Sequence, residues 1–270
     1  MSSPIWFVNI IKKAFPQRFM MARMTRLPLI GRGIDHLLFE GDDLIYLPKD
    51  QTVKVNEEVM AEDIVLPSQL VESFIAKANC LWIMDTCLCR EASQCKDYPI
   101  ELGCLFMGEA AMGINPKLGR EVTREEALQH VRKCREAGLF HLIGRNKMDT
   151  RWLNVRPGTR LLTVCSCCPC CCLWKILPVL THKVSDKIHR MPGVKVKVTE
   201  KCTACGTCEK DVCIAKAIHV EGDRAVISEE CRGCGNCASV CPEGAIELTI
   251  EDSSFMDGLI PRITSLVDVT

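Results

Sequence analysis

The sequence predicts an α+β fold in which a helical arm precedes a mixed, cysteine-rich domain and a small C-terminal module follows it. Three observations lead to this prediction. Apolar residues recur at helical spacing near the N-terminus, twelve cysteines accompany mixed helix and strand patterns in residues 79–195, and residues 201–252 repeat one cysteine motif. The predicted regions are a basic amphipathic arm at 1–34, a cysteine-rich domain at 35–195, the module at 196–252 and a tail at 253–270.

Composition narrows the class of protein. The chain has 270 residues and 47% hydrophobic content, which is enough for a sizeable core. Its formal net charge is zero, so nothing in the balance indicates a nucleic-acid partner. Twenty cysteines without a recognisable secretory signal favour metal binding over disulfides. We therefore expect a protein of a reducing, anaerobic cytoplasm, with no apolar window of about 18 residues to span a membrane.

The arm is predicted to form two short helices. Ser3 is a suitable cap with Pro4 at the first helical position, and Pro16 interrupts the pattern. The second helix is expected over residues 17–26. Its predicted buried side chains are Phe19, Met20, Met24 and Leu27.

The charge of the arm leaves two interpretations open. Its basic residues are Lys12, Lys13, Arg18, Arg23, Arg26 and Arg32, and the first acid is Asp35. A basic amphipathic segment with aromatic residues is typical of a helix at a membrane surface. The alternative is a helix packed on the protein's own core or on a partner subunit. Residues 1–30 are the candidate contact with a membrane.

The cysteine-rich domain should combine a capped helix with short strands. Thr123 and Glu126 form a capping box, and Gly138 is expected to end the helix that follows. Short strands are predicted at 139–143 and 161–164. Cys134 and His141 are expected to be core residues.

The cysteines of this domain predict one or two iron–sulfur clusters. Neighbouring cysteines are poorly placed to bridge to each other, and six thiols within eight residues are an oxidation liability unless metal holds them. The candidate ligands are Cys87, Cys89, Cys95 and Cys104, together with Cys165, Cys167, Cys168, Cys170, Cys171 and Cys172. Each stretch holds a cluster of its own, or both meet around one cluster. Arg90 is a candidate cofactor-binding residue, as a donor to cluster sulfur or to a bound anion.

The C-terminal module carries the most specific motif. Its first half places cysteines at 202, 205, 208 and 213, and its second half places them at 231, 234, 237 and 241 before Pro242. Three cysteines at three-residue spacing plus a distant fourth fit a [4Fe-4S] cluster. Zinc fits poorly because its structural sites favour separated pairs of ligands. The first half has one extra residue before Cys213, and we expect a local bulge near Asp211.

These residues closely resemble the bacterial ferredoxin family that binds two [4Fe-4S] clusters. The resemblance implies a ferredoxin fold of two short hairpins and two helices. It also implies that one cluster is held by Cys202, Cys205, Cys208 and Cys241, and the other by Cys231, Cys234, Cys237 and Cys213. Over residues 80–250, the CxCR and CxCCxCC motifs at 87–90 and 165–171 resemble a group of iron–sulfur proteins of strict anaerobes, which implies electron transfer.

Three functions follow as expectations. The first is an electron-transfer protein that connects two ferredoxin clusters with at least one further cluster, and whose partner is a redox protein or a larger oxidoreductase complex. The second is a reductase with an open-coordination cluster in the 87–172 region, acting on a disulfide or a corrinoid. The third is a metal-binding scaffold without redox function. The expected location is the cytoplasm, either free or peripherally bound at the inner face of the membrane.

Overall fold

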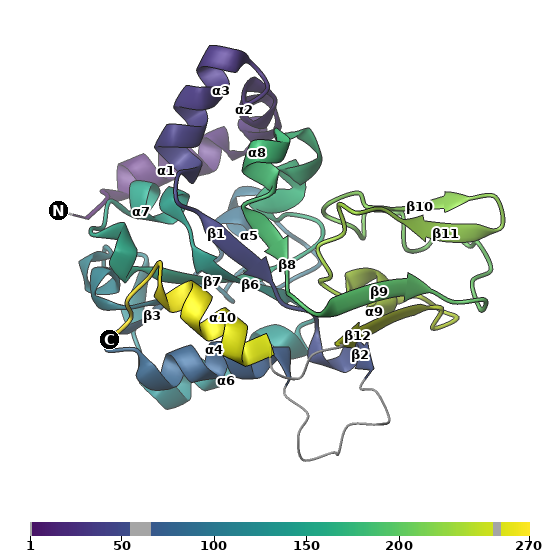
Figure 1. The fold of residues 1–270 in the computed structure, drawn as a ribbon. Helices are drawn as coiled ribbons and strands as arrows, with labels where there is room; N and C mark the ends of the chain where they lie inside the picture. Colours follow the sequence, from purple (N-terminus) through teal and green to yellow (C-terminus); the bar gives the residue numbers. More distant parts are fainter. Residues whose placement is uncertain (1, 55–65, 251–254) are drawn as a thin grey trace.

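The structure is a computed structural model that describes residues 2–54, 66–250 and 255–270. It mixes helices and sheets, as the sequence predicts (Figure 1). The helices are α1 Ile5–Ala14, α2 Arg18–Met24, α3 Pro28–Ile34, α4 Pro67–Lys77, α5 Leu88–Ala92, α6 Arg124–Glu136, α7 Lys147–Leu153, α8 His182–Ser185, α9 Asn236–Val240 and α10 Phe255–Thr264. The strands are β1 Asp43–Tyr46, β2 Val53–Lys54, β3 Leu81–Met84, β4 Leu105–Met107, β5 Gly119–Glu121, β6 Phe140–Arg145, β7 Leu162–Cys167, β8 Ile188–Arg190, β9 Val194–Val198, β10 Ile218–Glu221, β11 Arg224–Ile227 and β12 Ile246–Ile250.

A seven-stranded sheet forms the centre of the molecule, in the order β5-β3-β4-β7-β6-β1-β8. Its strands pair antiparallel except for β1 with β8. Side chains alternate between the two faces of a strand. In β7, Leu162 and Val164 therefore join one core, while Cys165 and Cys167 lie against the other. This alternation separates the larger apolar core from the cysteines.

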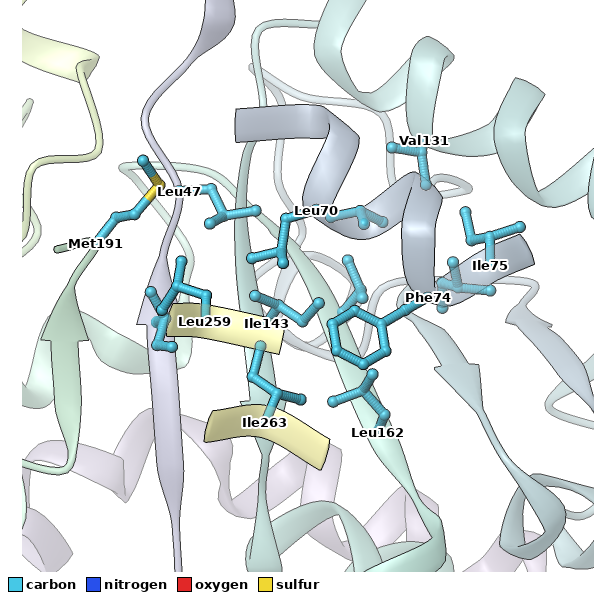
Figure 2. Close-up of a cluster of buried hydrophobic side chains, with 14 of the residues drawn as sticks. Leu47, Leu70, Phe74, Ile75, Val131, Ile143, Leu162, Met191, Leu259 and Ile263 are labelled. Atoms are coloured by element: carbon cyan, nitrogen blue, oxygen red, sulfur yellow. The ribbon is translucent and has the colours of Figure 1, made fainter. Parts of the chain in front are cut away.

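The larger core lies where α4, α6 and α10 cover the sheet. Figure 2 shows Leu70 and Phe74 of α4 beside Ile143 of β6 and Leu162 of β7. Leu259 of α10 packs on the same core. Each such side chain contributes about 1.5–3 kcal/mol when fully buried.

Local signals explain where these helices begin. Helix α4 starts with Pro67, whose missing N–H costs nothing at that position. The predicted capping box of α6 is confirmed, because the Glu126 amide donates to Thr123 Oγ1 and the Thr123 amide donates to the Glu126 carboxylate. Gly138, at φ +77°, lies just after the helix as predicted.

The C-terminal module adds two small sheets. Strands β10 and β11 form a hairpin, and β12 pairs with β9 on one side and β2 on the other. Helix α9 follows Gly235 in the second half of the repeat. The first half has turns and no equivalent helix. Its extra residue explains the difference, since Asp211 adopts φ +55° and a left-handed residue interrupts a helix. The expected bulge near Asp211 is confirmed. The expectation of two helices in the C-terminal module is wrong, because its first half forms turns instead.

The arm forms the two predicted helices, α1 and α2, and a third one, α3, that the apolar spacing does not predict. The burial of its side chains also differs from the expectation. The prediction of buried Met20 and Leu27 is wrong, because these side chains are 57% and 48% exposed. In Figure 1, α1, α2 and α3 lie at one end of the molecule, away from the β10–β11 hairpin. Among the described residues, no helix combines the length and apolar character needed to cross a bilayer.

The predicted division into regions stays a prediction. Strand β2, from the predicted cysteine-rich domain, pairs with β12 of the C-terminal module. The predicted boundary between residues 252 and 253 lies outside the described residues.

Candidate metal centres

All twenty cysteines lie in the described part of the chain, and none forms a disulfide. Eighteen of them gather in four groups, two in the upstream domain and two in the C-terminal module. Two cysteines lie outside these groups. Cys80 belongs to a separate apolar core, where burial raises its thiol pKa to about 11. Cys134 is fully buried on α6, as predicted, and its Sγ lies 3.6 Å from His130 Nε2.

The first upstream group, here the four-cysteine group, consists of Cys95, Cys168, Cys170 and Cys171. Their sulfur atoms all lie within 4.8 Å of one another. Cys170 Sγ is 3.6 Å from the sulfur atoms of both Cys95 and Cys168. The Cys171 amide donates to Cys168 Sγ at 3.4 Å. The loop after β7 thus turns back on itself around Pro169 and meets Cys95, which follows α5.

The second upstream group, here the six-cysteine group, lies on the opposite face of the sheet from the larger core. It consists of Cys87, Cys89, Cys104, Cys165, Cys167 and Cys172. Cys104 Sγ and Cys165 Sγ are 3.8 Å apart because β4 and β7 are neighbouring strands. The upstream cysteine stretches therefore interleave, and each group takes members from both.

The crowding of these thiols fits a bound cation. Hydrogen bonding to Cys165 and burial raise the pKa of Cys104 well above its ordinary value. Cys89 donates to Cys87 and lowers the pKa of Cys87 to about 6, while the pKa of Cys89 itself rises. Buried thiolates at this spacing repel one another, so they need a positive charge among them. Metal binding supplies that charge and displaces the protons.

Arg90 lies between the two upstream groups and is fully buried. Its guanidinium donates to the carbonyls of Pro99 and Ser166, both at 2.7 Å, and to the carbonyl of Leu102. Its charge lies beside the thiols of both groups. Arg90 thus connects α5, the 99–102 loop and β7. Its cofactor-binding role stays a prediction.

In the C-terminal module, each predicted set of four cysteines comes together. One shallow cavity is lined by Cys202, Cys205, Cys208 and Cys241. The other set gathers around Cys237, whose neighbours are Cys213, Cys231 and Cys234. The distant fourth cysteine of each motif thus joins the triplet of the other motif, as the resemblance implies. The assignment of all eighteen cysteines as ligands stays a prediction.

Backbone amides surround these sulfur atoms. The amides of Ala225, Ala245 and Ala217 donate to the sulfur atoms of Cys202, Cys241 and Cys213, each at 3.3 Å. Gly233 N donates to Cys231 Sγ at 3.4 Å. Such bonds stabilise negative charge on sulfur and raise cluster potentials. They fit a thiolate-bound cluster.

The two C-terminal sets differ in their access to solvent. Cys205 is exposed at the surface of the first set. Cys234 of the second set is only partly exposed, and desolvation raises its thiol pKa to about 12. The first set is therefore closer to solvent, and the second lies toward the upstream domain.

Two residues near the second set escape sequence reasoning. Lys49 donates from its backbone to the Cys234 carbonyl at 3.2 Å and from Nζ to Asn236 Oδ1 at 2.9 Å. Tyr46 is fully buried, and its neighbours include Cys234 on one side and Cys165, Cys167 and Cys172 on the other. Neither residue belongs to a local motif, because the sheet alone brings them to the cysteines.

Comparison with known proteins gives one match. Residues 208–251 match the family model of the LdpA Fe-S cluster-binding domain, a stretch that holds six of the eight C-terminal cysteines. Searches of curated proteins and of solved structures give no match. The matched family and the grouped cysteines together indicate that the C-terminal part of the chain is an iron–sulfur cluster-binding domain.

Proposed function

We propose that this protein transfers electrons between two ferredoxin-type [4Fe-4S] clusters and one or two further clusters in the upstream domain. One observation carries the proposal: the second C-terminal set and the six-cysteine group share one apolar core. That core includes Tyr46 and Phe140, together with Cys167 and Cys172 on one side and Cys231 and Cys234 on the other. Clusters at these positions form a continuous route through the protein.

The ferredoxin clusters take their ligands as the sequence resemblance implies. Cys202, Cys205, Cys208 and Cys241 hold the first cluster, and Cys213, Cys231, Cys234 and Cys237 hold the second. The exposed Cys205 makes the first cluster the place where electrons are exchanged with a redox partner protein or a larger oxidoreductase complex.

The six-cysteine group favours electron transfer over reduction of a bound substrate. A cubane has four irons, and six thiols suffice to coordinate each of them. A substrate-binding iron needs an open position, which this donor set does not leave. The reductase alternative is therefore less well supported than electron transfer.

The four-cysteine group could hold either an iron–sulfur cluster or a zinc ion, and metal analysis distinguishes the two. A tetrahedral site with Zn–S bonds of about 2.3 Å has sulfur atoms about 3.8 Å apart. The 3.6 Å separations around Cys170 are close to that value. We propose an iron–sulfur cluster here, in keeping with the rest of the chain, and zinc is the competing outcome.

Anaerobic purification with iron, sulfide and zinc counting, combined with EPR, tests this function. About twelve or sixteen irons per chain support one or two upstream clusters, at four irons per cubane. About eight irons, with or without a zinc, contradict the upstream clusters. Absence of reduced-cluster EPR signals contradicts the electron-transfer proposal as a whole.

We also propose that the arm binds an anionic membrane surface. Eight of the twelve large hydrophobic side chains exposed in the described residues lie between positions 6 and 37. Trp6 and Leu29, for example, are 65% and 82% exposed. The arm also carries basic residues, and the first acid that follows them, Asp35, forms ion pairs with Lys183 and Lys187. Exposed apolar and basic side chains together suit the headgroup region of anionic lipids.

The inner side of the arm packs on the protein, so the outer side remains for the membrane. Val8 is buried, Lys12 pairs with Glu91 at 2.7 Å, and the Ser3 amide donates to the Leu153 carbonyl. The arm is thus held in place with its exposed side chains outward.

Vesicle flotation tests this contact. The full chain should float with vesicles of phosphatidylglycerol and phosphatidylcholine and much less with phosphatidylcholine alone. Leu29→Glu should abolish flotation, whereas Met112→Glu, at an exposed apolar position elsewhere, should not. Equal flotation of both variants, or none by the unmodified chain, contradicts membrane binding and leaves a protein partner as the occupant of this surface.

A further inference from the structure

A cavity of about 200 Å³ lies between the segment that follows β1, the start of α4 and the end of α6. Apolar side chains, including Leu47 and Phe140, form part of its wall. The polar groups that matter for a ligand are Lys49, Ser68, Arg132, Arg135 and His141. None of the eighteen grouped cysteines lines it.

Two buried polar atoms in the residues that line the cavity, Arg135 Nη1 and His141 Nε2, have no hydrogen-bond partner in the described part of the chain. His141 is only 4% exposed, and its other ring nitrogen lies 3.3 Å from Ser166 Oγ, which fixes the ring. Buried polar groups are almost always satisfied, because an unpaired one loses its hydrogen bond to water without replacement. Two such atoms in the wall of one cavity favour a polar ligand there, which reaches them when the wall yields slightly.

The charges around the cavity favour an anion. Lys49, Arg132 and Arg135 contribute three positive charges, and Asp50 and Glu136 contribute two negative ones. Asp50 is already occupied, since its Oδ1 accepts from the Ser68 amide at 3.1 Å and its Oδ2 lies 3.9 Å from Arg135 Nε.

The remaining cations keep donors for a ligand. Arg135 also approaches Glu72 through Nη2 at 3.4 Å, which leaves Nη1 as its unpaired donor. Lys49 Nζ bonds to the neutral groups of Asn236 and Ser239, and no carboxylate of the described residues pairs with it.

We infer that this cavity binds a small molecule that carries a carboxylate or phosphate group. An Arg guanidinium recognises either group through two parallel hydrogen bonds. The apolar part of the wall accommodates the carbon skeleton of such a ligand. Binding itself does not depend on the proposed clusters.

A second part of the inference rests on the proposed function. The ammonium group of Lys49 lies between this cavity and the second C-terminal set, beside Cys234 and Cys237. An anion bound beside Lys49 offsets part of that positive charge. Since a reduced cluster carries one more negative charge, the bound anion lowers the reduction potential of the second cluster. The ligand thus tunes electron flow between the module and the upstream domain.

Anaerobic calorimetry on the full chain tests binding, with succinate and inorganic phosphate as the two probes. At least one probe should bind saturably, and the stronger one identifies the anionic group. Arg132→Gln should weaken that binding at least tenfold. Lys133→Gln is the matched control, because Lys133 is exposed on the same helix and does not line the cavity. Failure of both probes overturns the site, and equal weakening by both variants overturns its location.

An EPR-monitored redox titration tests the coupling. With the bound probe at saturation, the potential of the second cluster should fall, while that of the more distant first cluster changes less. Intact binding with unchanged potentials overturns the coupling alone. If the chain contains no second cluster, the proposed function fails, but calorimetry still decides whether the anion binds.

Discussion

The sulfur atoms of Cys104 and Cys165 lie 3.8 Å apart although 61 residues separate them in the chain. The contact arises from the pairing of β4 with β7, so it depends on the folded sheet. We expect Cys104→Ala to lower the iron content per chain, by at most about the four irons of one cubane, and to keep the EPR signals of the ferredoxin clusters. Metal analysis and EPR of the anaerobically purified variant measure both effects.

The control for this variant is Cys80→Ala, which removes a more deeply buried thiol that belongs to none of the four cysteine groups. It should keep all its iron. If the two variants lose the same amount of iron, Cys104 has no special role in the six-cysteine group.

Tyr46 offers a second test, because its buried hydroxyl has no hydrogen-bond partner among the residues that the structure describes. Tyr46→Phe keeps the ring, which packs at 5.8 Å from Phe140, so stability should change by less than about 1.5 kcal/mol. A hydroxyl that donates toward cluster sulfur raises the potential. Tyr46→Phe should therefore lower the potential of an adjacent cluster in a redox titration. Trp174→Phe, in the same core, should leave the potentials unchanged. A Tyr46→Phe variant with unaltered potentials refutes the contact.

The buried guanidinium of Arg90 leads to a prediction about stability and about iron binding by the upstream cysteine groups. Its guanidinium holds three carbonyl groups, and a lysine ammonium does not reproduce that planar geometry. Arg90→Lys should cost several kcal/mol of stability, since buried carbonyls lose their partners, and should reduce the upstream iron content. Denaturation and metal analysis measure the two effects. The exposed Arg120→Lys should change neither. Full iron content and unchanged stability in Arg90→Lys contradict this account.

Asp42 predicts a dependence of stability on pH. Burial raises its pKa to about 7, although the Lys147 amide donates to it and works in the opposite direction. The folded protein therefore keeps a proton that the unfolded chain releases near pH 4. Stability from this group is present below about pH 4 and is lost as the pH rises to about 7, by an amount on the order of a few kcal/mol.

Chemical denaturation at pH 5 and pH 8 checks this sign. Asp42→Asn should reduce the loss of stability between the two values, because the amide stays neutral at both. An identical pH dependence in Asp42→Asn and the unmodified chain would falsify the assignment.

Local sequence signals predict some helices and cysteine sets correctly, but they do not predict contacts between distant parts of the chain. The Thr123–Glu126 box predicted the start of α6, because capping acts within four residues. Similarly, the spacing of the C-terminal cysteines led to sets of four that the structure brings together. The upstream groups were beyond prediction, since the contact of Cys95 with Cys170 spans 75 residues and depends on how the chain folds around the sheet. The same holds for Tyr46 and Lys49.

The arm shows a different limit of the sequence. Its helical spacing is clear, but apolar residues occur on several sides of α1 and α2, so periodicity did not reveal which side faces the core. Helical spacing predicts Met20 and Leu27 in the interior, whereas both side chains lie at the surface. Contacts such as that of Lys12 with Glu91 decide the orientation, and they involve distant parts of the chain.

In the C-terminal module, the fourth cysteine of each half lies with the triplet of the other half. This arrangement affects when a cluster can be inserted during synthesis of the chain. Cys241 meets the first triplet and Cys213 meets the second. A nascent chain that ends before residue 231 therefore lacks a complete donor set for either cluster. If the proposed ferredoxin clusters form, their insertion has to wait until translation has passed the second motif, because neither half alone brings four cysteines to one site.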